Sequence, residues 1–91
     1  MYNNSEYQYT NLAAGTTAQI FSGKGKLHAV TVNATASTIF AIYDGVATTV
    51  LPVGKLKASV AENTYFFDAA LSAGCYVTYA AGDYTVLWSK A

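Results

Sequence analysis

Turn-forming residues recur about every 8–12 positions along this sequence, and this spacing limits the chain to short elements. The segments between them are dense in β-branched and aromatic residues, which pack well on a pleated sheet. Such a pattern predicts an all-β fold, either an antiparallel β-sandwich or a jelly-roll-like arrangement, with about 7–9 short strands. The turn signals are Ala14-Gly15, Gly23-Lys24-Gly25, Ala34 to Ser37, Asp44-Gly45, Pro52-Val53-Gly54, Ser72-Ala73-Gly74 and Gly82-Asp83.

The predicted strands cover most of the chain, at residues 5–12, 17–22, 26–34, 37–43, 48–52, 55–60, 63–69, 75–80 and 84–89. The segment from Lys55 to Glu62 (KLKASVAE) is also compatible with a single helical turn. We expect residues 1–12 to form an extended N-terminal arm or a first edge strand, and residues 13–91 to form one β-sandwich domain.

Several strands are apolar on both faces, although successive side chains of a strand point to opposite sides of a sheet. The segment NTYFFDAALSAGCYVTY, from Asn63 to Tyr79, has three aromatic residues in a row. Hydrophobic residues make up 53% of the chain and charged residues 11%, whereas charged residues usually account for about 25%. We interpret the second apolar face as a surface that another protein covers.

The alternation along each strand assigns residues to a core or to a contact surface. In the strand at 26–34, His28, Val30 and Val32 share one face, and the flat set of Ala29, Thr31 and Asn33 shares the other. A one-residue slip in register would exchange the roles of Phe66 and Phe67. The predicted core is Val30, Val32, Phe40, Ile42, Phe66, Val77, Val86 and Trp88; the predicted contact residues are Tyr43, Tyr65, Phe67, Tyr76 and Tyr79, with Tyr7 and Tyr9 in the arm.

Residues able to carry out chemistry are scarce. His28 is the only histidine, so a two-histidine metal site is impossible. Cys75 is the only cysteine; as a nucleophile it would need His28 as its base, whereas free cysteines usually act as small buried apolar residues. We therefore expect no enzymatic activity, no cofactor and no metal.

The charge and hydropathy patterns also exclude several partners. Five Lys balance five acidic residues, so we expect no nucleic-acid binding. No run approaches the roughly 18 apolar residues of a membrane span, and the start MYNNSEYQYTN has no signal-peptide pattern. A single cysteine allows no internal disulfide, which is typical of a protein assembled in a reducing cytoplasm.

The order of strands and turns resembles that of small β-rich virion proteins of tailed bacteriophages. The residues that carry the resemblance are Leu27 to Asn33, a strand ending in Tyr43-Asp44-Gly45, the aromatic-Asp segment from Tyr65 to Asp68, the small-residue turn Ser72 to Gly74, the Val/Thr/Tyr strand Tyr76 to Tyr79 and the final strand Asp83 to Trp88.

This resemblance implies a non-enzymatic structural role in the virion, assembled in the cytoplasm of the bacterial host. The protein would decorate or cement the capsid, or belong to a head fibre or tail part. Its partners would be copies of itself, with a trimer preferred because capsid lattices offer three-fold positions, and other virion proteins such as the major capsid protein.

An alternative function is a small β-sandwich binding module for a glycan or a host-surface ligand, carried on a phage tail or fibre. Such a module needs an exposed aromatic ring beside polar groups in loops, because the ring stacks on a sugar and the polar groups bind its hydroxyls. The candidates for this site are Asp44, Asp83 and Tyr84.

Overall fold

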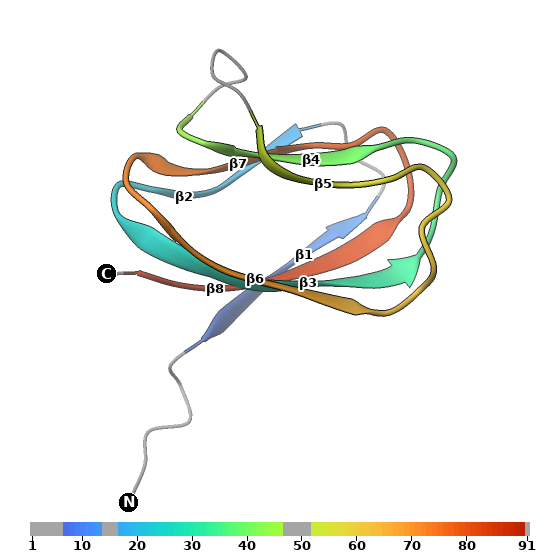
Figure 1. Cartoon of the computed structure of the whole chain (residues 1–91), viewed down its shortest axis with the longest axis horizontal. Coiled ribbons are helices and arrows are strands. Elements are labelled where there is room, and N and C mark those ends of the chain that lie inside the picture. The colour runs from blue at the N-terminus through green and yellow to red at the C-terminus, as the bar shows by residue number, and fades with distance from the viewer. Residues whose placement is uncertain (1–6, 14–16, 47–51, 91) are drawn as a thin grey trace, which may run out of the picture.

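Two layers of antiparallel strands form the protein, as seen in the computed structural model in Figure 1, which describes residues 7–13, 17–46 and 52–90. The described residues contain strands and turns and no helix, which confirms the predicted all-β class. The strands are β1 (Gln8–Ala13), β2 (Thr17–Ser22), β3 (Gly25–Ala34), β4 (Phe40–Asp44), β5 (Pro52–Leu56), β6 (Thr64–Leu71), β7 (Gly74–Thr78) and β8 (Asp83–Lys90).

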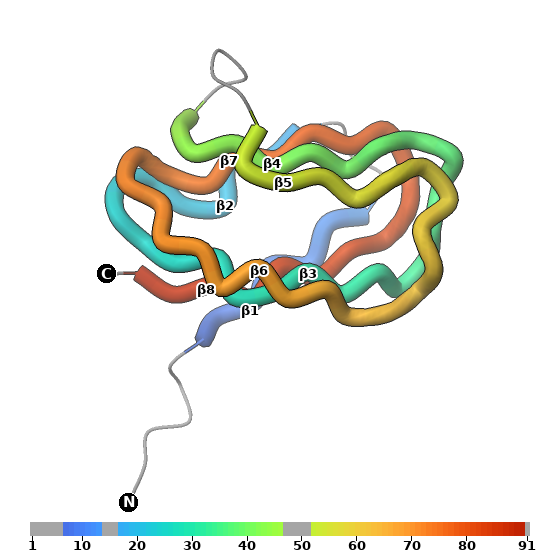
Figure 2. The backbone as a smooth tube through the Cα atoms, viewed as in Figure 1, coloured from blue at the N-terminus to red at the C-terminus, as the bar shows by residue number. Residues whose placement is uncertain are grey.

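The strand order identifies the sandwich as a jelly roll. Sheet A has the order β1-β8-β3-β6 and sheet B the order β2-β7-β4-β5. The first strand pairs with the last, the second with the seventh, the third with the sixth and the fourth with the fifth, all antiparallel. The chain is therefore one long hairpin rolled into two facing sheets. The smooth backbone trace shows the chain passing repeatedly from one layer to the other, except between β4 and β5, which stay in one sheet (Figure 2).

The core lies between the sheets and is lined by the inward residues of both. Its largest fully buried side chains are Tyr84, Phe40, Leu27, Ile42, Val30, Val77, Val86 and Cys75. Three aromatic rings meet at its centre: Phe40 lies 4.5 Å from Tyr84 and 5.8 Å from Tyr79, measured between ring centroids. Seven of the eight predicted core residues either lie in this core or pack against it; Trp88 is only half-buried at its border.

Phe66 is the exception, because 66% of its surface is exposed, and its assignment to the core was wrong. Phe67, predicted to be a contact residue, instead packs against the core. The two roles are exchanged, as a one-residue slip in register would do.

Two glycines let aromatic rings approach the backbone closely. A Cβ at Gly25 would collide with the ring of Phe21, and a Cβ at Gly54 would lie 2.6 Å from the ring of Phe67. Phe21 in turn stacks on Trp88, with 5.3 Å between the ring centroids.

The predicted strand limits need correction around β5. Pro52-Val53-Gly54 was predicted to be a turn but opens β5, which ends at Leu56. Of the strand predicted at 55–60, only Lys55 and Leu56 lie in a strand, the end of β5. The predicted helical turn does not form, and Ala58 and Ser59 instead make a turn in which the Ser59 amide donates to the Ala36 carbonyl at 2.7 Å. Of the strand predicted at 48–52, only its last residue lies within the described residues.

The N-terminal segment appears in the structure as the edge strand β1 rather than as a separate arm, from Gln8 onward. Residues 1–6 of the predicted arm lie outside the described residues.

Candidate functional site

The outward surface of sheet A carries the aromatic side chains with the highest exposed fractions among the described residues. Tyr9 is 74% exposed and Phe66 is 66% exposed. They lie at opposite edges of one row across the sheet, because Tyr9 pairs with Leu87, Leu87 with Ala29, and Ala29 with Phe66. We call this surface the aromatic face and define it by Tyr7, Tyr9, His28, Phe66 and Leu87.

The register shifts on both sides of His28, and the bulge in β3 turns its side chain outward, toward the face where the regular alternation of β6 places Phe66. Between Leu27 and Ala29, β3 has one residue more than β8, whereas over the same interval β6 has one residue more than β3. Asp68 lies in the β6 bulge with a φ of +47°, a left-handed conformation that few residues other than glycine adopt. His28 therefore leaves the face of Val30 and Val32 that the simple alternation predicted for it.

His28 is the centre of a small cluster on this face. Its ring stacks on Tyr7 at 4.1 Å with an interplanar angle of 12°, and it meets the edge of Phe66 at 5.4 Å. Its Nδ1 lies 2.6 Å from Oδ1 of Asp68, and the Lys26 ammonium lies 4.0 Å from the same oxygen. The cluster fixes the side chains of β3 and β6 together beneath Tyr7.

A polar network borders the aromatic face. The amide Nδ2 of Asn11 donates to Asp83 at 2.8 Å, and that of Asn33 donates to Asp83 at 3.2 Å and to the Thr85 hydroxyl at 2.9 Å. The two asparagines reach Asp83 from β1 and β3, the strands on either side of β8. The network links three strands, and its member Asn11 lies two residues from Tyr9 on the same face of β1.

The predicted contact residues do not form one surface. Tyr7 and Tyr9 lie on the aromatic face. Tyr43 and Tyr76 are half-buried and pair with each other across β4 and β7 in sheet B. Tyr65 packs against the core, and its hydroxyl donates to the Ala61 carbonyl at 2.7 Å.

Tyr79 and Tyr84 were both placed wrongly by the sequence reasoning. Tyr79 is a core residue with 5% exposure, so its side chain is not offered to a partner. Tyr84, the aromatic candidate for a glycan site, is 1% exposed, and burial raises the pKa of its hydroxyl. Neither ring can stack on a ligand from this position.

The two candidates for nucleophilic chemistry are separated. Cys75 is fully buried in β7 of sheet B, where burial, followed by the charge of Asp44, raises the pKa of its thiol to about 12. His28 contacts side chains on the outward face of sheet A. A thiol in the core without an imidazole beside it stays protonated and unreactive.

Asp44 holds a turn together and is not free to bind a ligand. Its carboxylate accepts hydrogen bonds from the backbone amides of Ala73 at 2.8 Å and Ser72 at 3.1 Å. These amides lower the pKa of the Asp44 carboxyl below its usual value. The glycan hypothesis therefore loses Asp44 as well as Tyr84. Of its three candidates Asp83 is left, which is partly buried and accepts hydrogen bonds from Asn11 and Asn33.

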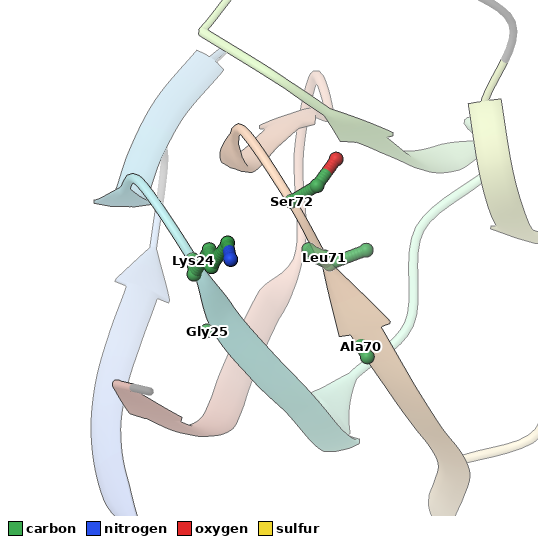
Figure 3. Close-up of a pocket in the computed structure, with 5 residues that line it drawn as sticks. All are labelled: Lys24, Gly25, Ala70, Leu71 and Ser72. Carbon is green, nitrogen blue, oxygen red and sulfur yellow. The ribbon is translucent and has the colours of Figure 1, made fainter.

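A shallow hollow of about 240 Å³ lies where the β2–β3 turn approaches the end of β6, lined by Lys24, Gly25, Ala70, Leu71 and Ser72 (Figure 3). Lys24 is its one charged residue. Among the residues that the structure describes, no three His, Cys, Asp or Glu side chains gather as a metal site would require.

Comparison with known proteins gave no match, whether with family models, with curated proteins or with solved structures. Within the described ranges, no helix has the length and apolarity needed to cross a membrane.

Phe66, Asn11 and Asn33 are the surface residues that the sequence reasoning missed. Phe66 follows the regular alternation of β6, but both faces of this strand are apolar around Phe66 and Phe67, so the sequence alone did not show which face is buried. The outward position of Asn33 was visible in the alternation of β3, but its contact with Asp83, 50 residues away, depends on the roll of the chain.

Proposed function

We propose that this protein is a non-enzymatic structural component of a bacteriophage virion that decorates or cements the capsid through protein-protein contacts made by the aromatic face. The observation that carries the proposal is the exposure of Tyr9 and Phe66 on the same outward surface of sheet A. Exposed aromatic residues that gather on one surface are typical of interaction sites.

The energetics of this surface suit docking. Covering the exposed parts of Tyr9 and Phe66 would remove roughly 250 Å² of surface from water, worth about 6 kcal/mol before the costs of association. The low charge of the chain, 11% of its residues, keeps the desolvation of ionised groups small. The virion part of the proposal rests on the strand and turn pattern of the sequence, and jelly rolls occur in viral capsid and lectin domains alike.

Co-sedimentation with particles of the phage that encodes the chain tests this proposal. Phe66→Ser and Tyr9→Ser should each weaken binding to the particles by about 30-fold, because central aromatic contacts are typically worth 2 kcal/mol or more. Val53→Ser is the matched control, since Val53 is 46% exposed but lies in sheet B. No binding by the unmodified chain, or equal losses in the control, would contradict the proposal.

A glycan-binding module is the second candidate, and one feature favours it. The exposed ring of Tyr9 shares one face of β1 with Asn11, whose amide donates to Asp83, and Asp83 also accepts from Asn33. An aromatic ring next to such a polar network is able to stack on a sugar and bind its hydroxyls. A glycan array compares the two candidates: a selective signal that Tyr9→Ala and Asn33→Ala abolish supports this one, and an empty array removes it.

A further inference from the structure

Each sheet of the sandwich has two edge strands, and three of these four edges are protected. An edge strand presents unpaired backbone N–H and C=O groups, which can pair with another chain, and natural proteins block them with bulges, charges or proline. The edges of sheet A are β1 and β6, and those of sheet B are β2 and β5.

The protection of β2, β5 and β6 is visible in their register. β5 begins with Pro52, carries Lys55 and is bulged. β6 is bulged at Asp68, whose backbone is left-handed and whose side chain is charged. β2 is bulged next to Gln19, whose side-chain amide donates to the Phe21 carbonyl at 2.6 Å and to the Cys75 carbonyl at 3.1 Å.

β1 has none of these devices. Its sequence QYTNLA contains no charged residue, no proline and no glycine. Its register with β8 runs without a shift from Gln8–Trp88 to Ala13–Asp83. Over its described residues, β1 is therefore a regular edge strand without charged side chains, and it also carries Tyr9.

We infer that β1 pairs antiparallel with β1 of a second copy of this chain. The inference rests on the proposed assembly role and deepens it by naming the strand and the partner. An antiparallel pair related by a two-fold axis places outward residues opposite outward residues, so Tyr9 and Asn11 of one copy lie beside those of the other. Sheet A becomes a continuous eight-stranded sheet, and the two aromatic faces join into one surface.

The pairing defines a two-fold dimer and not the trimer expected from the resemblance. A three-fold ring that continued sheet A would have to pair β1 of each copy with β6 of the next. The bulge at Asp68 interrupts the regular hydrogen-bonding edge that such a junction requires. The second β1 offers a regular edge of equal length.

Sedimentation equilibrium and amide hydrogen exchange test this inference on the full chain. We expect the mass to rise from one chain to two between micromolar and millimolar concentration. Those amides of β1 that point away from β8 should exchange more slowly as the dimer forms. A monomer over the whole range, a trimer, or a dimer whose β1 amides exchange at an unchanged rate would overturn the inference.

The chain offers a matched pair of variants for this edge. Asn11 and Asn33 both donate to Asp83 and Thr85, but Asn11 is on the edge strand β1 and Asn33 on the inner strand β3. Asn11→Lys places two like charges near the two-fold axis and should weaken the dimer about five- to tenfold. Asn33→Lys should leave the dimer unchanged, and an equal effect of both variants contradicts pairing at β1.

The proposed function and this inference can fail separately. Phe66→Ser should lose binding to phage particles and keep the dimer, because Phe66 lies on β6 at the far edge of sheet A. A dimer through β1 that does not bind particles would sustain the inference and remove the virion role. Binding to particles by a chain that stays monomeric would support the virion role and overturn the pairing through β1.

Discussion

Burial determines the chemistry of Cys75 at the scale of a single residue. The thiol is fully buried, and its pKa is raised to about 12 because the core disfavours the thiolate. The thiolate is the form that reacts with disulfide reagents. We expect Ellman's reagent to leave Cys75 unmodified in the folded protein at mildly alkaline pH and to titrate one thiol after denaturation. Fast labelling of the folded chain would contradict this placement.

Asp44 makes folding stability depend on pH in the acid range. Its folded pKa is lowered, mainly by the backbone amide of Ala73 and then by that of Ser72. The unfolded chain therefore binds more protons between the two pKa values, so the stabilisation is complete above the ordinary value of 3.8 and is lost as the pH falls through the folded pKa.

Asp44→Asn should reduce this dependence. Urea unfolding between about pH 5 and pH 2 should show a smaller loss of unfolding free energy in the variant than in the unmodified chain. The asparagine oxygen can still accept one of the amides, so the turn itself should be retained. Equal slopes for the two proteins would show that Asp44 does not supply the effect.

Gly25 is required by the ring that lies against it. A Cβ at this position would collide with the ring of Phe21, which is held between the backbone and Trp88. Gly25→Ala should lower the free energy of unfolding by about 1–3 kcal/mol, the usual cost of overpacking a core. Phe21→Leu in the Gly25→Ala background should recover part of this loss, whereas additive losses would rule out the collision as the cause.

Strand β6 shows, at the scale of an element, how the choice of the buried face decides a prediction, because Tyr65, Phe67, Ala69 and Leu71 alternate regularly toward the core. Phe66 is exposed while Phe67 packs on the core over Gly54. Phe66→Ala should change the free energy of unfolding by less than about 1 kcal/mol, and Phe67→Ala should lower it by about 2–4 kcal/mol. Chemical denaturation of the two variants compares them directly, and a larger loss for Phe66→Ala would restore the original assignment.

Local pattern was sufficient to predict most of the elements. The strand predicted at 17–22 coincides with β2, and those predicted at 26–34, 75–80 and 84–89 differ from β3, β7 and β8 by one or two residues at their ends. These segments combine β-branched or aromatic residues with a glycine-containing turn beside them, and both signals are local.

Tertiary contacts decided the features that sequence reasoning missed. The bulge in β3 turns His28 outward, where it contacts Asp68, 40 residues away. The buried positions of Tyr79 and Tyr84 depend on their meeting Phe40 from another strand. An alternating pattern cannot distinguish a tyrosine that covers a core from one that covers a partner.

At the scale of the whole molecule, the rolled hairpin pairs the first strand, β1, with the last strand, β8. β8 lies between β1 and β3, and it contributes the buried side chains of Tyr84 and Val86. β1 pairs with β8 alone, and Leu12 is its one buried residue. β8 therefore holds two neighbouring strands and part of the core, whereas β1 adds one edge and one buried side chain, although the two strands are neighbours in the same sheet.

Truncation from either end should have unequal consequences. A chain that begins at residue 14 loses one edge strand and Leu12, so it should fold with a free energy of unfolding lowered by several kcal/mol. A chain that ends at residue 82 loses the strand that holds β1 to β3 together with two core residues, and it should not fold. Far-UV circular dichroism and thermal unfolding distinguish these outcomes, with a chain beginning at residue 7 as the control that keeps all eight strands.

Because removal of β1 also removes the edge proposed for pairing, the chain that begins at residue 14 should be monomeric at concentrations where the control dimerises. A folded chain without β8 would mean that sheet A is not organised around its last strand.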